Sequence, residues 1–369
     1  MISRRTFMAV GAAAVAAPTV LRAAPDPYVV GTLFHLTGNL AELGSVFRAG
    51  SALAFTHIAA DGQLKRPLDV RAQDTQSTPQ GGAVGMTKLV NVDGAIAVIT
   101  GGTGVSKAVA PIGTRAKALM LNGAGVGPDL AGISPFFYNV IPLASQEVPV
   151  AVDWMKAAGV KRVAFIYLDD PLGAALLKEL RSALPGIGAS LVGEYSAAPS
   201  AQQFAAVAAK VREIQPDLVY VASYGTQQTQ IFKQLRDNGV TQQFMTYSSG
   251  GVPSSSALPE CDGLLFTSQA ADWSAKDRVT RRFVDDWRRI YGTDPTTYAQ
   301  NYYNAALLIS ELIVRLERDG RPVDGPALRD VLEAGSFSLA GGEARFQGGA
   351  VVMPIQLNRV SNGRFEKVG

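Results

Sequence analysis

The stretch 95–112, AIAVITGGTGVSKAVAPI, constrains the fold of this chain more than any other. It begins with an apolar, β-branched run over residues 95–100, which is typical of a short buried parallel strand. Gly101, Gly102 and Gly104 then interrupt the run, and an alanine-rich helical stretch follows. A helix that starts in this way has unpaired backbone N–H groups and partial positive charge at its N-terminus. The stretch therefore predicts a place for an anion, where the Thr103 hydroxyl adds a donor.

Three more specific motifs fit this loop poorly. A phosphate-binding P-loop needs Ser or Thr after its lysine, but here Ser106 comes before Lys107. A dinucleotide-binding fingerprint needs glycine where Lys107 stands. The hydrolase pattern G-x-S-x-G is half met around Ser106, yet both histidines, His35 and His57, precede it, and the catalytic histidine should follow. An ordinary strand–helix turn and, with less support, a serine hydrolase using Ser106 remain open as alternatives.

The charge balance indicates what kind of partner to expect. The first 24 residues hold three of the 34 basic residues and no acidic one, so the remainder has 31 of each sign. Because that remainder is neutral, no nucleic-acid partner is expected. With 369 residues, of which 47% are hydrophobic and 18% charged, the chain is long enough for two domains with sizeable cores.

The N-terminus reads as a targeting segment. Residues 3–8, SRRTFM, resemble a twin-arginine export motif, and the apolar run 8–17 is too short to span a bilayer. Small residues at 23–24 suit cleavage. We expect an export signal over residues 1–24 and a mature protein in the periplasm. A Sec signal or a membrane anchor is the alternative for this segment.

The few cysteines and histidines exclude several kinds of site. Cys261 is the sole cysteine, so we expect no intrachain disulfide and no cysteine-based metal site, and Cys261 should be buried. With only two histidines we expect no zinc site and no metal or other cofactor. His57 falls on the apolar stripe of a helix and is expected to have hydrogen-bond partners within the protein.

From residue 28 onward, short apolar runs alternate with helical stretches. Strands are expected at 28–34, 68–72, 95–100 and 118–121, and, after an interruption at Pro142, at 161–168, 191–195, 217–223, 244–247 and 264–267. Helices are expected at 45–60, from Thr78-Pro79 onward, and at 145–158, 173–184, 200–215, 226–238, 277–291 and 298–318. A turn at Asn362-Gly363 should divide a strand-like tail, 351–368.

This order predicts an α/β protein with two doubly wound parallel sheets. Ligands of such sheets bind beyond the carboxyl ends of the strands, where the loops 101–104 and 122–130 fall. Two lobes that face each other there form a cleft that closes by hinge motion.

Several short segments together point to a family. They are Leu36-Thr37-Gly38, Leu43-Gly44, Asp74-Thr75-Gln76-Ser77, Val109-Ala110-Pro111, Lys161-Arg162-Val163-Ala164, Asp169-Asp170 with Gly173, and Tyr298 with Tyr302-Tyr303-Asn304. In this order they resemble the periplasmic substrate-binding proteins of branched-chain amino-acid ABC transporters, the leucine/isoleucine/valine-binding type. No single segment is specific, but the ordered set spans almost all of the chain that follows the export signal.

The resemblance implies a type I periplasmic binding fold with two lobes joined by three crossover hinges and a ligand cleft between them. The crossovers would lie near 141–142, 270–272 and Arg345, so that the lobes comprise 25–141 plus 272–345 and 142–271 plus 346–369. It implies a monomeric, non-enzymatic protein that binds a small carboxylate and delivers it to an ABC permease. A sensor that signals on closing is the alternative role.

The resemblance also places the ligand site residue by residue. The carboxylate-binding hydroxyl of the first glycine loop falls on Thr103, next to Gly104, and a backbone contact falls on Ala124. Two aromatic positions of the family match Tyr224 and Tyr298. The remaining three positions depart from the family: Val126 replaces a threonine that contacts the polar head, Leu172 replaces a tyrosine, and Ser249 stands near the place of the acid that pairs with the ligand ammonium.

These departures suggest a different ligand from the family's usual one. An unpaired buried ammonium costs several kcal/mol, so a site without the acid and the threonine favours a carboxylate with no paired α-ammonium. Tyr224, Tyr298 and Phe34 would flank its aliphatic or aromatic body. As the alternative, Asp170, Asp272 or Glu260 supplies the missing charge.

Two further features are expected away from the ligand site or at its edge. The arginine pairs 281–282 and 288–289, with acids between them, predict an ion-paired solvated helix face, or alternatively a docking surface for a membrane partner. Trp273 lies near a proposed hinge and is expected to line the cleft.

Overall fold

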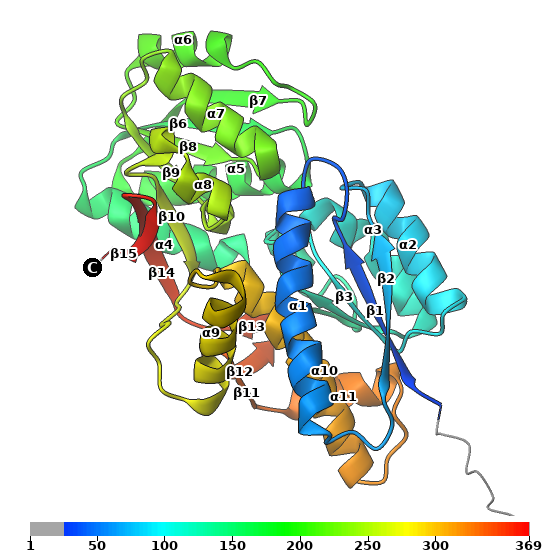
Figure 1. Ribbon diagram of the computed structural model, residues 1–369. Helices are drawn as coiled ribbons and strands as arrows, with labels where there is room; N and C mark the ends of the chain where they lie inside the picture. Colours follow the sequence, from blue (N-terminus) through cyan, green and yellow to red (C-terminus); the bar gives the residue numbers. More distant parts are fainter. Residues whose placement is uncertain (1–25, 369) are drawn as a thin grey trace, which may run out of the picture.

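A computed structural model describes residues 26–368 and shows two lobes, each built around one sheet (Figure 1). The predicted export signal lies outside the described residues. No helix among residues 26–368 is long and apolar enough to cross a membrane.

The first lobe contains a sheet of eight strands in the order β11-β12-β13-β5-β4-β3-β1-β2. Their bounds are β1 Tyr28–Phe34, β2 Leu68–Asp74, β3 Ala97–Thr100, β4 Leu119–Asn122, β5 Phe137–Asn139, β11 Phe337–Leu339, β12 Gly342–Gln347 and β13 Ala350–Val352. The strands β1 to β5 pair in parallel, whereas β12 runs antiparallel to both β11 and β13. Thr100 of β3 pairs with Asn122 of β4, so the loops that follow these strands leave the sheet side by side.

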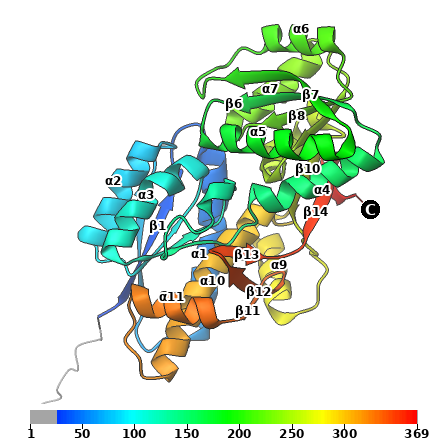
Figure 2. The same ribbon diagram turned by 180° about the vertical axis from the view of Figure 1, so that it is seen from behind.

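Helices cover both faces of this sheet (Figures 1 and 2). They are α1 Ala41–Asp61, α2 Pro79–Asn91, α3 Thr103–Ala116, α9 Arg278–Tyr291, α10 Thr297–Arg318 and α11 Gly325–Ala334, with a 3₁₀ turn η1 at Pro128–Leu130. The two long helices α1 and α10 pack on each other on one face, and α2 and α3 pack together on the other. Thr78 caps α2 by accepting from the N–H of Gly81, as the Thr78-Pro79 pair predicts.

The second lobe contains a sheet of seven strands in the order β15-β14-β10-β9-β8-β6-β7. Their bounds are β6 Arg162–Leu168, β7 Ser190–Ala197, β8 Leu218–Ala222, β9 Gln243–Thr246, β10 Leu265–Gln269, β14 Ile355–Ser361 and β15 Arg364–Lys367. The strands β6 to β10 pair in parallel, and the hairpin β14–β15 adds two antiparallel strands at one edge. The predicted turn at Asn362-Gly363 connects this hairpin.

The helices of the second lobe also form two layers. They are α4 Ala144–Ala157, α5 Pro171–Ala183, α6 Ala205–Ile214, α7 Gly225–Asp237 and α8 Pro253–Ala257, with 3₁₀ turns η2 Leu184–Ile187, η3 Ser248–Gly250 and η4 Pro259–Cys261. Figure 2 shows α4 and α5 on one face of the sheet, and Figure 1 shows α6 and α7 on the other. Two parallel-dominated sheets with helices on both faces confirm the predicted fold class.

The chain passes between the lobes three times. It leaves the first sheet after β5, leaves the second after β10, and returns to the second between β13 and β14. The third passage, at residues 353–354, lies later than the predicted Arg345, because β12 and β13 extend the first sheet. The short segment 350–352 gave no sequence signal that assigned it to one sheet or the other.

One local expectation, the start of a helix, differs from the structure. The helix expected to start at Ser200 begins at Ala205, because residues 201–204 form an irregular segment and the N-cap is Phe204 rather than Ser200. Phe204 provides no side-chain cap, and its own N–H donates to the side chain of Gln234 at 2.7 Å. The expectations for Cys261 and His57 are confirmed. Cys261 is buried, and the ring of His57 lies 2.8 Å from the Tyr303 hydroxyl and 2.9 Å from Asp286.

Candidate functional site

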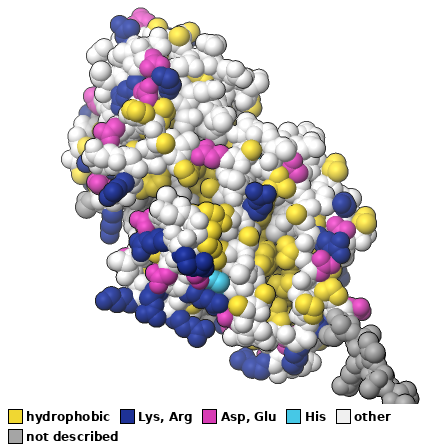
Figure 3. Space-filling model, viewed as in Figure 1, with side chains coloured by type: hydrophobic (Ala, Val, Ile, Leu, Met, Phe, Trp, Pro, Cys, Tyr) yellow, Lys and Arg dark blue, Asp and Glu magenta, His cyan; other side chains and the backbone are white. Residues whose placement is uncertain are grey.

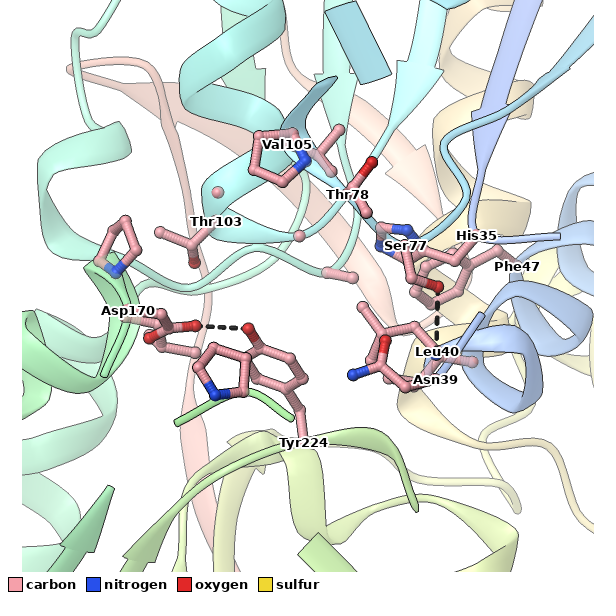
Figure 4. A pocket seen from close by; sticks show the side chains of 18 of the residues that line it. His35, Asn39, Leu40, Phe47, Ser77, Thr78, Thr103, Val105, Asp170 and Tyr224 are labelled. Carbon is pink, nitrogen blue, oxygen red and sulfur yellow. Dashed lines mark hydrogen bonds between the residues drawn. The ribbon is translucent and has the colours of Figure 1, made fainter. Parts of the chain in front are cut away.

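A cavity of about 310 Å³ lies between the two lobes, where the loops after the parallel strands face each other (Figure 4). Its lining is mainly apolar and aromatic, with a few polar groups. The lining residues are His35, Asn39, Leu40, Leu43, Phe47, Ser77, Thr78, Pro79, Gln80, Gly102, Thr103, Gly104, Val105, Ala124, Asp170, Pro171, Leu172, Pro199, Tyr224, Tyr247 and Tyr298. A cleft of this size and lining suits one small organic molecule.

The N-terminus of α3 supplies hydrogen-bond donors to the cavity. Its N-cap is Gly102, with φ of 84° and no side chain to cap the first N–H groups. Thr103 is the first residue of the helix, and its Oγ1 accepts a hydrogen bond from the N–H of Gly127 at 3.2 Å. The Thr103 oxygen is therefore held by Gly127, and its hydrogen is free to donate to a bound acceptor. Helix N–H groups, a helix dipole and a hydroxyl at one place suit a carboxylate.

Aromatic rings from α1 and α10 form an apolar wall. Phe47 stacks on Tyr302 with ring centroids 4.0 Å apart, and Tyr298 lies 6.1 Å from Phe47. Phe34 meets Tyr302 edge-on at 5.2 Å, behind the cavity lining. Phe47 and Tyr298 line the cavity themselves, so this wall can contact the apolar body of a ligand.

Asp170 is the one carboxylate among the residues that line this cavity, and no lysine or arginine lines it. Asp170 caps α5 by accepting from the N–H of Gly173 at 2.7 Å, and its other oxygen accepts from the Tyr224 hydroxyl (Figure 4). Burial and the nearby Asp170 raise the pKa of Tyr224, which keeps the phenol protonated. Both carboxylate oxygens of Asp170 thus have a donor from the protein.

His35 adds a polar group at the first-lobe side of the cavity. It follows β1 directly, is 2% exposed, and packs 5.8 Å from the Phe47 ring. Burial lowers the pKa of the imidazole to about 4, so the ring is neutral at physiological pH.

A second carboxyl group, Glu147, lies buried behind the cavity wall. Its Oε2 accepts from the N–H of Ser248 and from the Thr267 hydroxyl, both at 2.9 Å. Burial raises its pKa to about 7, because no cation offsets the loss of hydration. Ser248 follows Tyr247, a residue of the cavity lining, so Glu147 supports the wall without lining it.

Six of the eight predicted site residues lie together in this cavity lining: Thr103, Gly104, Ala124, Leu172, Tyr224 and Tyr298. Val126 is not among them, because it is fully buried in the core and its carbonyl accepts from the N–H of Ala144. Ser249 is not among them either. It is buried, its Oγ lies 3.2 Å from that of Thr246, and its carbonyl accepts from Gln228.

Sequence reasoning missed several lining residues. The residue near Ser249 that lines the cavity is Tyr247, two positions earlier, and its hydroxyl donates to the Ser223 carbonyl at 3.0 Å. Phe47 was also missed, because an apolar residue in a helix gives no sign that it lines a cavity. His35 was missed because a lone histidine after a strand gives no such sign either. The sequence offers Asp170 only as an alternative source of the missing charge, and the structure places it in the lining.

Other candidate residues lie elsewhere. Ser106 is fully buried within α3 and does not line the cavity, which removes the geometric basis for the hydrolase interpretation. Glu260 pairs with Lys233 at 2.9 Å, and Asp272 accepts from Ser274. Trp273 lines a different hollow, near Arg288, rather than the cleft, because it packs toward α9. Among residues 26–368 no group of three His, Cys, Asp or Glu side chains is arranged to hold a metal ion.

The arginines of α9 lie on the surface, as predicted. Figure 3 shows basic side chains gathered around this helix. Arg282 pairs with Asp61, Arg288 with Asp294, and Arg289 with Asp286, each at 2.7 Å. Asp61 belongs to α1 and Asp294 to the loop after α9, so these two ion pairs connect the exposed face of α9 to its neighbours.

The lobes touch each other at the edge of the cavity. The N–H of Thr226, at the start of α7, donates to the Asn39 carbonyl at 3.4 Å. The N–H of Ser254, at the start of α8, donates to Glu42 at 2.9 Å. These bonds join the second lobe to the first at the beginning of α1.

Comparisons with known proteins agree with this architecture. A family model described as "Periplasmic binding protein" matches residues 27–364. The Leu/Ile/Val-binding protein homolog 3 of Brucella melitensis is 24% identical over 317 residues, which cover 83% of each chain. Among solved structures, a solute-binding protein of R. palustris in complex with benzoate is 18% identical with a TM-score of 0.84, covering 93% of this chain and 96% of that one. A leucine-binding protein of Thermotoga maritima is 20% identical with a TM-score of 0.84, covering 93% and 98%.

Proposed function

Because this chain belongs to the periplasmic binding protein family, we propose that it binds a small organic carboxylate between its lobes and delivers it to an ABC permease. The predicted export signal over residues 1–24 supports a periplasmic location. Binding would proceed without a cofactor and in a monomer. Closure around the solute brings the two lobe surfaces into one arrangement, which a permease can distinguish from the empty open form.

The observation that carries this proposal is the donor site at the start of α3. The Thr103 hydroxyl and the uncapped first turn of the helix offer hydrogen bonds and a favourable dipole, with no basic side chain among the lining residues. Such a site prefers a single negative charge on a group with several acceptor lone pairs. One structural neighbour was solved in complex with benzoate and another is a leucine-binding protein, and both benzoate and leucine carry a carboxylate.

We further propose that the ligand lacks a paired α-ammonium. Val126 is buried away from the cavity, and the segment 247–251 contributes a tyrosine and no acid. Asp170 lines the cavity, but both of its oxygens already accept hydrogen bonds from the protein. The aromatic wall of Phe47 and Tyr298 suits an aromatic or branched aliphatic body.

Thermal unfolding of the chain lacking residues 1–24 tests this function. The panel contains benzoate, cinnamate, 4-methylpentanoate, the 2-oxo analogues of leucine and valine, and leucine, valine and phenylalanine themselves. A ligand at ~100 times its dissociation constant adds ~2.7 kcal/mol, enough to raise the midpoint by several degrees. We expect shifts with the acids and none with the amino acids. A strong shift with leucine or valine would return the ligand to the amino-acid class, and no shift with any member would contradict the carboxylate proposal.

A further inference from the structure

The ring of His35 lies beside the donor site of α3. A Cβ atom placed on Gly102 would come within 2.9 Å of His35 Nε2, so the ring edge lies against the N-cap of the helix. Figure 4 shows His35 on the same side of the cavity as Ser77 and Phe47. Nε2 has no hydrogen-bond partner among residues 26–368, whereas Nδ1 lies 2.6 Å from the Thr75 hydroxyl oxygen.

The contacts of Thr75 determine which ring nitrogen carries the proton. Thr75 is fully buried, and its Oγ1 already accepts a hydrogen bond from the N–H of Ser77 at 3.1 Å. The hydroxyl hydrogen needs an acceptor, and the one acceptor that it meets among residues 26–368 is His35 Nδ1. Nδ1 therefore accepts, and the neutral ring carries its hydrogen on Nε2.

We propose that His35 is a ligand-binding residue whose Nε2–H donates to the same solute carboxylate that the N-terminus of α3 binds. This inference rests on the proposed function. It explains why a polar ring, rather than an aliphatic side chain, follows β1 at a position that is 2% exposed. Asp74 is the charged group that acts on the ring, and burial outweighs it, so His35 contributes a neutral donor.

NMR spectroscopy can test the tautomer of His35 directly, because the chain has two histidines and their signals are easily separated. Long-range ¹H–¹⁵N spectra of the imidazoles at pH 7 should show His35 as the neutral Nε2–H tautomer. The assignment follows from the loss of its signals in His35→Gln. A neutral Nδ1–H tautomer, or a charged ring at pH 7, would overturn the inference. This measurement needs no ligand, so its result is separate from the outcome of the ligand panel.

The second measurement titrates benzoate into the native protein and three variants. His35→Leu keeps the approximate size of the side chain but removes the donor, and benzoate should bind at least tenfold more weakly. His35→Gln restores an N–H donor and should bind within about threefold of native. His57→Gln is the matched control, because His57 bonds to Tyr303 and Asp286 and does not line the cavity.

The outcomes separate the two proposals. Benzoate binding that is equal in native protein and His35→Leu would overturn the role of His35 and leave the carboxylate function standing. Weakening that His35→Gln fails to restore would also count against a donor role, because packing alone would then explain the loss. If benzoate and the other panel acids do not bind the native protein, the proposed function fails, whatever the tautomer of His35.

Discussion

The carbonyl oxygen of Asn39 lies only 2.5 Å from the position that a Cβ atom would take at Gly225. Asn39 belongs to the first lobe and Gly225 starts α7 in the second, so this close approach exists only while the lobes face each other as they do here. The neighbouring N–H of Thr226 donates to the same carbonyl. Gly225, with φ of 61°, therefore lies where the backbones of the two lobes are in direct contact.

Replacing this glycine should affect closure more than folding. In Gly225→Ala the new methyl group meets the Asn39 carbonyl and keeps the lobes apart, so we expect at least tenfold weaker binding of whichever panel acid the native protein binds. The positive φ also costs about 1 kcal/mol of folding stability, because alanine adopts it poorly. Isothermal titration and thermal unfolding measure the two effects separately.

Gly62→Ala is the matched control for that experiment. Gly62 has a similar φ of 57°, but no atom lies within 4 Å of the Cβ position. This variant should lose a similar amount of folding stability and keep native affinity. Native-like affinity in Gly225→Ala would show that the lobes need not approach at Asn39 for binding.

Asp170→Asn distinguishes an acid ligand from an amino acid. In asparagine, Oδ1 can still cap α5 by accepting from Gly173, whereas Nδ2 replaces the oxygen that accepts from Tyr224 and donates to the Tyr224 oxygen instead. The substitution removes the negative charge from the cavity. If the ligand is a carboxylate without an ammonium, its affinity should stay the same or increase, because a like charge is lost. A tenfold or greater loss would indicate that Asp170 pairs with a cationic group of the ligand. Asp169→Asn, at the exposed neighbouring position, is the control, and calorimetry gives the affinities.

Thr103 should be the most sensitive position of the donor site. Thr103→Val removes the hydroxyl that donates to the ligand and leaves the N–H of Gly127 without its acceptor. We expect affinity to fall tenfold or more, since hydrogen bonds to charged groups contribute about 1.5–3 kcal/mol. The midpoint of thermal unfolding should also fall. Thr103→Ser keeps the oxygen and should bind within a few-fold of native; equal affinity in the valine variant would exclude this hydroxyl from the site.

The sequence predicted most of the strands, the two lobes and the glycine loop before α3, because each depends on local patterns, but it gave no signal for β5, β11 or β12. A β-branched run, three glycines and a helix start can be recognised without tertiary contacts, and they place Thr103 between β3 and α3, where the structure has it. The residues that the second lobe contributes to the cavity were harder to predict. Tyr247 and Ser249 differ by two positions in a short loop, and only the turn η3 decides which of them reaches the cavity. His35 could not be assigned, because its role depends on Thr75 and Gly102, which are distant in sequence.

The buried carboxyl of Glu147 predicts an unusual pH dependence of stability. Its pKa is about 7 in the folded protein and near 4.5 when exposed, so the folded state holds a proton that the unfolded state releases. The stability that this proton contributes is complete below pH 4.5 and is lost as the pH rises through 7. The loss is on the order of 3 kcal/mol by pH 8.

Glu147→Gln should remove that loss, because the amide oxygen still accepts from Ser248 and Thr267 and carries no charge. We expect native protein and variant to melt at similar temperatures at pH 5, and the variant to melt several degrees higher at pH 8. Comparing the two proteins at each pH cancels the opposite contribution of His35, whose lowered pKa costs stability as the pH falls from 6.5 toward 4. Glu213→Gln, at an exposed position of α6, should leave the pH profile unchanged. Parallel profiles for native protein and Glu147→Gln from pH 5 to 8 would mean that Glu147 is ionised in the fold throughout, and that an unrecognised donor stabilises its charge.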